Sequence, residues 1–220
     1  DDAANPYGGV NPPPNDGAGF FPPKAPNGAA PRVGLIVKQD DNGVWRDDNG
    51  ADWSEYVSGA KAAMSGRPAG WTLIDHDVAR IDANTLAVDY AGGLMNICMA
   101  LGVNPATGVV TVVGTDATNE VRFEPVLRGT FLRVRIGFVD DTLDTSFADL
   151  NPHLDYQTAS VPPPQRGPSI GDPRAIVWNA GGDRGYIAGM GSNNVIVVDA
   201  SGARIGVMAM PVPEGPTGLV

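Results

Sequence analysis

The sequence predicts an all-β fold that repeats one group of short antiparallel strands. The stretch Met99–Glu124 aligns with Arg174–Asp199 without a gap, and Asn104 falls on Asn179. The alignment also matches Gly114 with Gly189, Asn119 with Asn194 and Glu124 with Asp199. Internal repetition of this kind indicates an array of one supersecondary unit. The 29 glycines and 20 prolines among the 220 residues supply the frequent turns that short strands need.

The spacing of the repeat favours a β-propeller. Asp82 follows an apolar strand as Asp199 does, and it precedes Glu124 by 42 residues. Pro173–Val177 recurs as Pro216–Val220, a shift of 43 residues. Four-stranded propeller blades recur about every 40–45 residues. The 75 residues from Glu124 to Asp199 are then one blade plus an insertion of about 32 residues. A β-sandwich also has short strands, but it does not predict these intervals.

The regions expected from this spacing begin with an extended arm. Residues 1–31 are rich in Pro, Gly and Asn, as in polyproline-type segments, and Phe20 and Phe21 would anchor the arm to a surface. Residues 32–220 form the expected propeller segment. Its blades are expected at about 33–90, 94–139 and 173–210, with an insertion at about 140–171 and the next blade from 216. Because propellers close with about 4–8 blades, the sequence predicts an incomplete β-propeller that the remaining blades or a second polypeptide completes.

Apolar runs bounded by turn residues define the expected strands, and helical spacing defines one helix. Turn residues 104–108 and 199–202 predict antiparallel hairpins. In Trp53–Met64 the apolar side chains fall at helical spacing. The expected strands are Val33–Lys38, Val78–Ile81, Leu86–Tyr90, Leu94–Val103, Val109–Val113, Glu120–Phe123, Phe131–Val139, Ala175–Trp178, Gly185–Ala188, Asn194–Val198 and Ala203–Met210.

Composition and charge exclude several classes of protein. The net charge of -10 and pI near 4.5 argue against a nucleic acid as partner, because phosphate binding needs clustered Lys and Arg. Without an apolar run of about 18 residues, the chain is not expected to span a membrane. Cys98 is the only cysteine, which excludes a disulfide within the chain and a CxxCH haem site, and it is expected to pack as a small core residue.

Asp1–Ala4 looks like a mature terminus left by cleavage of a signal peptide, although an arbitrary boundary would look the same. The sequence stops inside the apolar run Gly218–Val220, where a strand would begin.

The two histidines are the candidates for a transition-metal site. His153 is followed by Asp155, and His76 lies between two aspartates, so a carboxylate could orient either imidazole. Hydrogen-bonded loop histidines are the favoured interpretation, because no partner stands at ligand spacing. His153 and Tyr156 are also candidates for an interaction site, since the expected insertion would place them in a loop on a rigid scaffold.

Carboxylates and sulfur atoms suggest two further metal sites. For both sets of residues a structural role is favoured over metal binding. Carboxylates favour calcium, but no Asp-x-Asp-x-Asp-Gly loop is present. The acidic candidates are Asp40, Asp41, Asp47, Asp48 and Asp52 around Trp45, and Asp141, Asp144 and Asp149. Met95, Cys98 and Met99 are conceivable copper ligands, yet alternation along a strand separates them unless a bulge intervenes, so core packing is favoured.

Charges on neighbouring strands predict ion pairs, and no catalytic signature accompanies them. Arg122 and Glu124 lie on the same face of one strand, and Arg133 and Arg135 alternate on the next strand, which predicts cross-strand ion pairing. No Gly-x-Ser-x-Gly or comparable nucleophile signature is present, so a hydrolase is not supported.

Two stretches resemble the YVTN-type β-propeller repeats of bacterial exported proteins. The first, DPRAIVWNAGGDRGYIAGMGSNNVIVVDASGARIG, carries the Asn-Ala-Gly-Gly-Asp turn, the Tyr-Ile-Ala strand and an apolar strand that ends in Asp. The second, VNPATGVVTVVGTDATNEVRFEP with the later LNPHLDY, is similar to a subgroup of large surface proteins. In that subgroup the propeller often continues into c-type cytochrome or di-haem peroxidase-like domains. The resemblance implies an extracytoplasmic location, and any haem c would belong to a segment or partner outside this chain.

Three functions are compatible with these patterns. The favoured one is a propeller scaffold of a larger surface or periplasmic protein or complex, associated with a c-type haem redox domain. The alternative is a module that binds a protein or another ligand without a redox role. A propeller enzyme such as a lactonase is less favoured, because the fold alone does not confer that activity.

Overall fold

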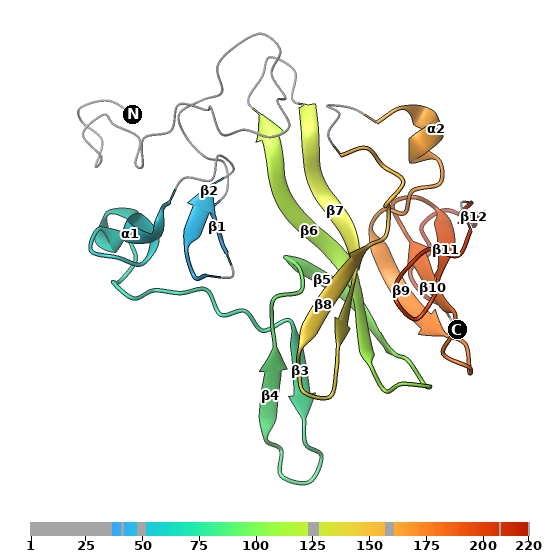
Figure 1. Cartoon of the computed structure of the whole chain (residues 1–220), viewed down its shortest axis with the longest axis horizontal. Helices are drawn as coiled ribbons and strands as arrows, with labels where there is room; N and C mark the ends of the chain where they lie inside the picture. Colours follow the sequence, from blue (N-terminus) through green and yellow to red (C-terminus); the bar gives the residue numbers. More distant parts are fainter. Residues whose placement is uncertain are drawn as a thin grey trace. The chain divides into compact units, whose positions relative to one another are not determined.

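The protein is an all-β chain, as the sequence predicts. The computed structural model describes residues 37–40, 42–47, 52–122, 128–156, 161–206 and 208–219, in which twelve strands form four small antiparallel sheets (Figure 1). The described strands form neither a closed barrel nor a closed ring of blades, so the propeller stays a prediction. The elements are β1 (Val37–Gln39), β2 (Trp45–Asp47), α1 (Ser54–Val57), the 3-10 helix η1 (Ala62–Ser65), β3 (Val78–Ile81), β4 (Val88–Ala91), β5 (Ile97–Val103), β6 (Val110–Arg122), β7 (Arg128–Val139), β8 (Thr145–Asp149), α2 (Pro163–Arg166), β9 (Pro173–Trp178), β10 (Gly185–Gly189), β11 (Asn194–Val198) and β12 (Met210–Pro211).

The chain divides into two compact units. The first holds β1, β2, α1 and η1, and the second holds the other sheets except the far ends of β6 and β7. No helix in the described part of the chain is long and apolar enough to cross a membrane.

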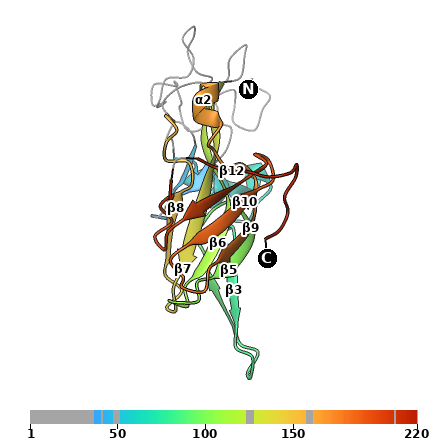
Figure 2. The same ribbon diagram turned by 90° about the vertical axis from the view of Figure 1, so that its right-hand side faces the viewer.

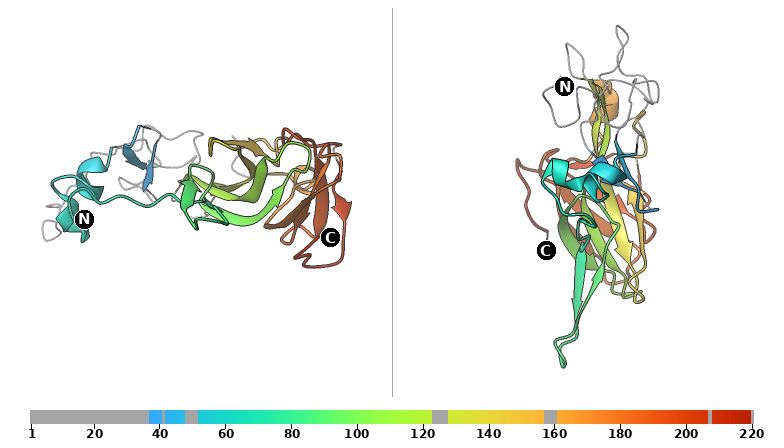
Figure 3. Two further views of the ribbon diagram at one scale, coloured as in Figure 1. Left: turned by 90° about the horizontal axis from the view of Figure 1, so that it is seen from below. Right: turned by 90° about the vertical axis from the view of Figure 1, so that its left-hand side faces the viewer.

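Two four-stranded sheets dominate the second unit, and both run in chain order. One sheet has the order β5-β6-β7-β8, and the other runs from β9 through β10 and β11 to β12. The second sheet occupies the residues at which the sequence predicts the blade 173–210. Their first strands, β5 and β9, lie alongside each other, so the two sheets form adjacent layers (Figures 1 and 3). Figure 2 views these layers from the side of the β9–β12 sheet.

The first hairpins of the two sheets have the same register and the same irregularity. In β5–β6, Cys98 pairs with Gly114 and Ala100 with Val113, so that Met99 is bulged out of the ladder. The β9–β10 hairpin likewise pairs Pro173 with Gly189 and Ala175 with Ala188, which leaves Arg174 as the extra residue. A bulge of this kind bends its strand and increases the local twist. The sequence repeat is therefore also a structural repeat over this hairpin.

The turns that close these hairpins are built alike. The amide of Asn104 donates to the carbonyl oxygen of Val109 (2.9 Å), and the amide of Asn179 donates to that of Arg184 (2.9 Å). Each asparagine side chain also accepts a bond from a backbone amide of its own turn, at Ala106 in one case and Arg184 in the other.

Beyond Gly114 the two sheets differ, and the sequence alignment no longer describes the structure. Asn119 lies within the long strand β6, whereas Asn194 begins β11, so these two residues are not equivalent. The structural counterpart of Asp199 is Asp140, because both close turns in which the aspartate amide donates to the carbonyl four residues on. The prediction that Glu124 matches Asp199 falls on a residue outside the described ranges.

The prediction of a first blade at 33–90 concerns a stretch that the structure describes only in part. The described residues of that stretch form two separate two-stranded sheets, β1–β2 and β3–β4, rather than one four-stranded sheet. The turn at Asp82 also differs from that at Asp199. Its amide donates to Ala87, five residues on, as in the Asn104 turn. The β3–β4 hairpin is therefore a counterpart of β5–β6 and not of the last hairpin of the sheet.

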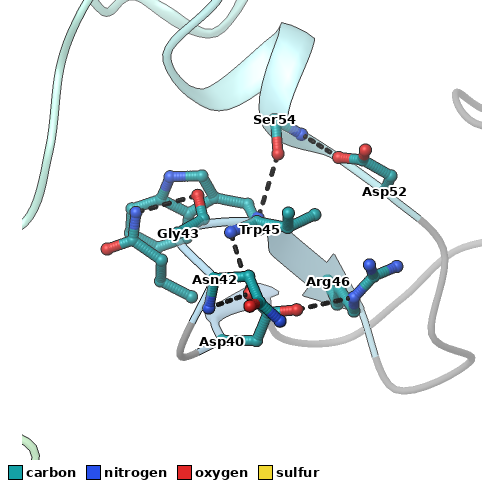
Figure 4. Close-up of polar contacts among 9 residues, drawn as sticks. Asp40, Asn42, Gly43, Trp45, Arg46, Asp52 and Ser54 are labelled. Carbon is teal, nitrogen blue, oxygen red and sulfur yellow. Dashed lines mark hydrogen bonds and ion pairs between the residues drawn. The ribbon is translucent and has the colours of Figure 1, made fainter.

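The predicted helix over Trp53–Met64 is present only as two short pieces, α1 and η1. Trp53 at the N-cap makes no side-chain cap bond, and the backbone leaves the helical conformation at Ser58 (φ -138°), so α1 ends after one turn. In front of it, Trp45 in β2 donates its amide to the hydroxyl of Ser54 (3.0 Å), which fixes the helix to the β1–β2 hairpin (Figure 4).

The stretch 140–171 is more regular than an insertion without strand pattern. Residues 145–149 form β8, the edge strand of the first large sheet, and residues 163–166 form α2. The side chain of Asn151 holds the end of this stretch in place. Its Nδ2 donates to the backbone carbonyl of Ile170, and its Oδ1 accepts the backbone amide of Ile170, both at 2.8 Å.

Apolar side chains form two cores on opposite faces of the β5–β8 sheet. The inter-sheet core lies between the two large sheets and consists of Val113, Ile136, Leu150, Ile170, Ile176, Ile187, Ile196 and Val198. The front core consists of Ala91, Leu94, Met95, Val112 and Val139. Full burial of one such aliphatic side chain contributes about 1.5–3 kcal/mol, so the β5–β8 sheet is stabilised by packing on both faces.

Candidate functional site

A turn-to-turn contact joins the two large sheets at the Asn104 turn. The side-chain amide of Asn104 is buried, 2% exposed, and Nδ2 donates to the carbonyl oxygen of Gly182 at 2.8 Å. Gly182 has φ +68°, and a Cβ there would collide with the Asn104 side chain and lie 2.6 Å from the Cβ of Ala106. Only glycine therefore permits this approach of the two turns.

A second polar contact joins β9 to the β5–β6 hairpin. The indole Nε1 of Trp178, at the end of β9, donates to the hydroxyl of Thr111 at 2.9 Å, and that hydroxyl donates to the carbonyl of Gly102 at 2.8 Å. The chain passes close by because Gly102 has no side chain: a Cβ there would lie 3.0 Å from the carbonyl oxygen of Ile176. Buried polar groups paired in this way fix which residues of the two strands face each other.

A cavity of about 370 Å³ opens at the turn end of the sheets. Most of the residues that line it are of polar type, and the lining consists of Asn104, Thr107, Val109, Thr111, Phe138, Asp140, Asp144, Thr145, Ser146 and Ala200. Several of these polar groups already serve the turns. The Asp140 carboxylate accepts the amides of Thr142 (2.9 Å) and Asp144 (3.0 Å), and the Thr145 hydroxyl donates to the carbonyl of Gly92 (3.0 Å). The cavity is thus lined chiefly by groups that the fold itself uses.

A partly buried ion pair crosses from β6 to β7. Nη1 of Arg135 lies 2.9 Å from Oδ2 of Asp116, whose side chain is 3% exposed, and the guanidinium lies over the ring of Phe147. Arg133 lies 3.8 Å from Asp149 on β8. Cross-strand ion pairing is therefore confirmed for Arg133 and Arg135, although their partners were not foreseen. The side chains of Arg122 and Glu124, the predicted partners, lie outside the described residues.

One side of the β5–β8 sheet carries an exposed apolar stripe. Leu101 is 62% exposed and Val103 is 53% exposed. Their neighbours across the ladder, Val112 and Val110, belong to or pack against the front core. We call Leu101 and Val103 the front stripe. Large apolar side chains at this exposure are a feature of interaction surfaces when they adjoin one another.

The opposite side of the stack carries an apolar face on the β9–β12 sheet. Alternation and register place its members on the side of β10 away from Ile187, so they do not face the inter-sheet core. Met210 is 45% exposed and Ile205 is 43% exposed. We call this set the back face, and it consists of Ala175, Val177, Tyr186, Ala188, Val195, Val197, Ile205 and Met210.

The predicted site residue His153 is part of the fold's internal bonding. Its Nε2 lies 3.0 Å from the carbonyl oxygen of Gln165 and 3.1 Å from the hydroxyl of Ser169, which fixes the stretch around α2. Asp155 is exposed and Tyr156 is half-buried. His76 is elsewhere: its ring stacks on that of Tyr90, with centroids 3.7 Å apart and planes within 5°. No group of three or more His, Cys, Asp or Glu in the described ranges is arranged to hold a metal.

The acidic residues near Trp45 cap turns. Oδ1 of Asp40 accepts the amides of Asn42 (3.0 Å) and Val44 (2.9 Å), and Oδ2 accepts Nε of Arg46 (2.9 Å) (Figure 4). The backbone bond from Val44 is the main reason that the pKa of Asp40 is lowered. Asp52 accepts the amide of Ser54 at 2.8 Å. Other predicted residues, namely Phe20, Phe21, Asp41, Asp48 and the side chain of Asp47, lie outside the described part of the chain.

Met95 and Cys98 lie together in the front core. Met95 is a member of that core, and Cys98 packs against it. Met95 precedes β5, which begins at Ile97, so alternation along that strand does not separate the two residues. Burial, and then the charge of Asp77, raises the pKa of the Cys98 thiol to about 11. Burial likewise raises the pKa of Asp77, whose Oδ2 accepts the amide of Leu94 at 2.8 Å.

Sequence reasoning missed the residues that join the two sheets. Asn104 was identified by the repeat, but its bond to Gly182 depends on how one sheet stacks on the next. The alignment of Asn104 with Asn179 is the signal that could have predicted it, because Gly182 belongs to the Asn179 turn.

Comparisons with known proteins find little. No family of known proteins matches the sequence, and no curated protein matches it. Among solved structures, a chain of Kuenenia stuttgartiensis hydrazine synthase is similar, with a TM-score of 0.43 and 12% sequence identity. The alignment covers 64% of this chain and 47% of that chain, so the likeness spans about half of the length of the solved protein.

Proposed function

We propose that this chain is an interaction scaffold, a segment of a β-propeller whose stacked sheets bind other proteins. The observation that supports this most is the packing of the β5–β8 sheet. The inter-sheet core covers one of its faces and the front core covers part of the other. The next sheet in the chain lies against it and repeats its first hairpin with the same bulge. A propeller blade is likewise a four-stranded sheet that packs against a neighbouring sheet on each face.

The relation between β5 and β9 also supports propeller blades over a sandwich. Each is the first strand of its sheet, and the two lie alongside each other at Gly102 and Ile176. Successive blades of a propeller approach most closely at their inner strands. Sandwich sheets, in contrast, keep a separation of about 10 Å and leave their outer faces polar. Here the outer side of the β9–β12 sheet is apolar along β9, β10 and β11.

The redox and export parts of the proposal rest on the resemblance to YVTN-type repeats. The residues of this chain do not fit haem c, because its one cysteine, Cys98, is half-buried against the front core with a pKa of about 11. Thioether attachment needs two cysteines and a histidine in CxxCH. Haem c would therefore be carried by another domain or protein, for which this scaffold provides a docking surface outside the cytoplasm.

An experimental structure tests the propeller. The rotation that superposes residues 97–114 on residues 172–189 is the quantity to measure. Blades in a ring of 4–8 require a rotation of about 45–90° around one axis, whereas sandwich sheets require about 30°. A rotation near 30° would contradict the propeller.

Photo-crosslinking in the producing cell tests the scaffold. A photoreactive amino acid is placed at Leu101 or Val177, with Asp89 on the exposed hairpin β3–β4 as the control position. The scaffold predicts specific protein adducts at Leu101 or Val177 and none at Asp89. Absence of adducts at both positions contradicts it. Haem in the adducts, read from the optical spectrum, and their presence in an extracytoplasmic fraction test the redox and export parts separately.

A further inference from the structure

Arg204 carries a buried charge that no group in the described part of the chain pairs. Both Nη atoms of its guanidinium are buried, and neither has a hydrogen-bond acceptor. An arginine side chain stays charged and carries five N–H donors, so its burial without a partner costs free energy. An orphaned group of this kind calls for an explanation, of which a bound ion is one.

The other arginines whose side chains the structure describes are paired or exposed. Arg67 lies over the ring of Trp71 and donates to the hydroxyl of Ser65, and Arg166 is exposed. Ion pairs with aspartates hold Arg46, Arg80, Arg133, Arg135, Arg174 and Arg184. Among these side chains, that of Arg204 alone has a buried head group without an acceptor.

The position of Arg204 places its side chain between the two large sheets. Arg204 forms an antiparallel bridge with Val198, and two residues paired in this way point their side chains to the same side. Val198 is fully buried in the inter-sheet core. The Arg204 side chain therefore starts on the side of its sheet that faces the β5–β8 sheet.

The opposite wall of this space is apolar. Gly202, two residues earlier and on the same side, lies against that wall: a Cβ there would be 2.8 Å from Cγ2 of Ile136 and 3.1 Å from the Cβ of Ala148. Asp149 of β8 does not serve as an acceptor here, because it lies near Arg133. The β7 and β8 side chains that belong to or pack against the inter-sheet core carry no acceptor, and they are Val134, Ile136, Phe138 and Ala148.

We propose that Arg204 binds a small free carboxylate between the two large sheets, through both of its Nη atoms. A guanidinium presents a planar pair of donors that matches the two oxygens of a carboxylate. The apolar wall favours a monoanion over phosphate, because the ion of higher charge costs more to desolvate. The net charge of -10 acts in the same direction, since it repels a dianion more strongly.

Burial of the donors also favours a free ion over the side chain of another protein. Both Nη atoms are covered, so an ion that enters when the sheets move apart briefly reaches them more readily than a folded partner does. The bound ion would pair the charge of Arg204 and so stabilise the contact between the sheets. This inference goes beyond the proposed scaffold and does not depend on it.

Nuclear magnetic resonance of the arginine side chains in the 220-residue chain measures the binding. Arg204→Met identifies the Nε signal of Arg204 by its absence. Sodium acetate is the probe, and sodium chloride at the same ionic strength is the control. The Arg204 signal is expected to shift with acetate and to saturate at roughly millimolar concentrations, as suits a ligand of few atoms. The signal of Arg184, which is exposed and lies near Asp183, should not follow it.

Thermal unfolding in the same two salts is the second measurement. In chloride, Arg204→Met should be at least as stable as the wild type, because methionine keeps an apolar stem and removes the unpaired charge. In acetate, the melting temperature of the wild type should rise and that of Arg204→Met should not, since a ligand stabilises only a chain that binds it. Arg204→Lys keeps the charge without the planar fork and should raise the dissociation constant for acetate at least about tenfold.

The source of the carboxylate is tested on chain purified from the producing cell without added organic acids. Unfolding the wild type should release a small carboxylic acid that mass spectrometry detects, and Arg204→Met should release none. Equal release from both would overturn the proposal, as would an Arg204 signal that acetate leaves unchanged. Tighter binding of phosphate than of acetate would overturn the assignment to a carboxylate. The crosslinks from Leu101 and Val177 are independent of all these results, so the scaffold function stands or falls separately.

Discussion

Met99 and Arg174 occupy equivalent positions in two hairpins, because each is the bulged residue in the first strand of its sheet. In both cases the ladder resumes at an alanine, Ala100 or Ala175. The bulge shifts alternation by one position, which turns Gly102 toward β9 and Leu101 away from it. One extra residue thus decides which side of the strand faces the neighbouring sheet.

Replacing Asn104 is expected to destabilise the protein more than replacing Asn179. Asn104→Ala removes the buried bond to Gly182 and leaves that carbonyl without its donor, at a cost of roughly 1–3 kcal/mol. Asn179→Ala removes bonds to Asp183 and Arg184, both exposed, and should cost under about 1 kcal/mol. Urea unfolding measures both free energies. Equal costs would show that the contact between turns contributes nothing.

Gly182→Ala should be among the most damaging substitutions in the second unit. The new Cβ would require Asn104 and Ala106 to move, in addition to holding alanine at φ +68°. Gly108→Ala is the matched control, since Gly108 has φ +76° and no atom within 4 Å of its Cβ position. The control should lose about 1–2 kcal/mol, the cost of a left-handed residue, and Gly182→Ala should lose more. Thermal or urea unfolding of the pair isolates the cost of the collision.

Leu86→Asn should stabilise the β3–β4 hairpin. Leu86 holds φ +60° with 72% of its surface exposed, so it stores backbone strain without burying its side chain. Asparagine tolerates this conformation better, and the gain should be about 0.5–1 kcal/mol. Leu73→Asn is the control, because Leu73 is also exposed but is not left-handed. A gain of the same size in the control would attribute the effect to lost surface apolarity instead.

The turn closed by Asp199 is expected to stabilise the fold less in acid. The hydroxyl of Ser201, together with the amides of Ser201 and Ala203, lowers the pKa of Asp199 below its ordinary value of 3.8. A carboxylate whose folded pKa is depressed stabilises the fold above its unfolded pKa and loses that contribution as the pH falls through the folded value. Asp199→Asn should therefore lower the melting temperature at pH 7. The difference in melting temperature from wild type should shrink below about pH 4. A constant difference down to pH 2 would contradict this origin.

Cys98 should react slowly with alkylating reagents at neutral pH. With a pKa of about 11 in place of 9.0, its thiolate fraction at pH 8 is roughly 100-fold below that of an ordinary cysteine. Asp77→Asn should speed the reaction, because the charge of Asp77 contributes to the shift after burial. Iodoacetamide labelling followed by mass spectrometry gives the rates, with the urea-unfolded chain as the reference for a free thiol. Labelling of the folded chain at the unfolded rate would show that the thiol is not buried.

Local turn chemistry is the part of the fold that sequence reasoning predicts well. Strands β9, β10 and β11 lie within about a residue or two of their expected bounds. The turns at Asn104 and Asp199 have side-chain oxygens that bond to their own backbone amides. Such residues mark the ends of strands directly, so the repeat could be recognised wherever they are present.

Features that depend on tertiary packing were not predictable. Strand β6 continues past Gly114 to Arg122 because it pairs with β7, although the alignment expects a break near Asn119. Strand β8 was not predicted, because it is an edge strand whose Phe147 is exposed, so it lacks the apolar pattern of a buried strand. Leu150 and Ile170 are isolated apolar residues in a Pro-rich stretch, and only the stacked sheets make them members of the inter-sheet core.

The turn at Asp82 has a consequence for how this architecture grows. It shares its backbone bonding with the turn at Asn104, although β3 and β4 stand alone as a pair. The repeated element is then two strands with their connecting loop, half of what a full sheet contains. Relatives that gain or lose material in steps of about twenty residues would preserve the pairing of every remaining strand.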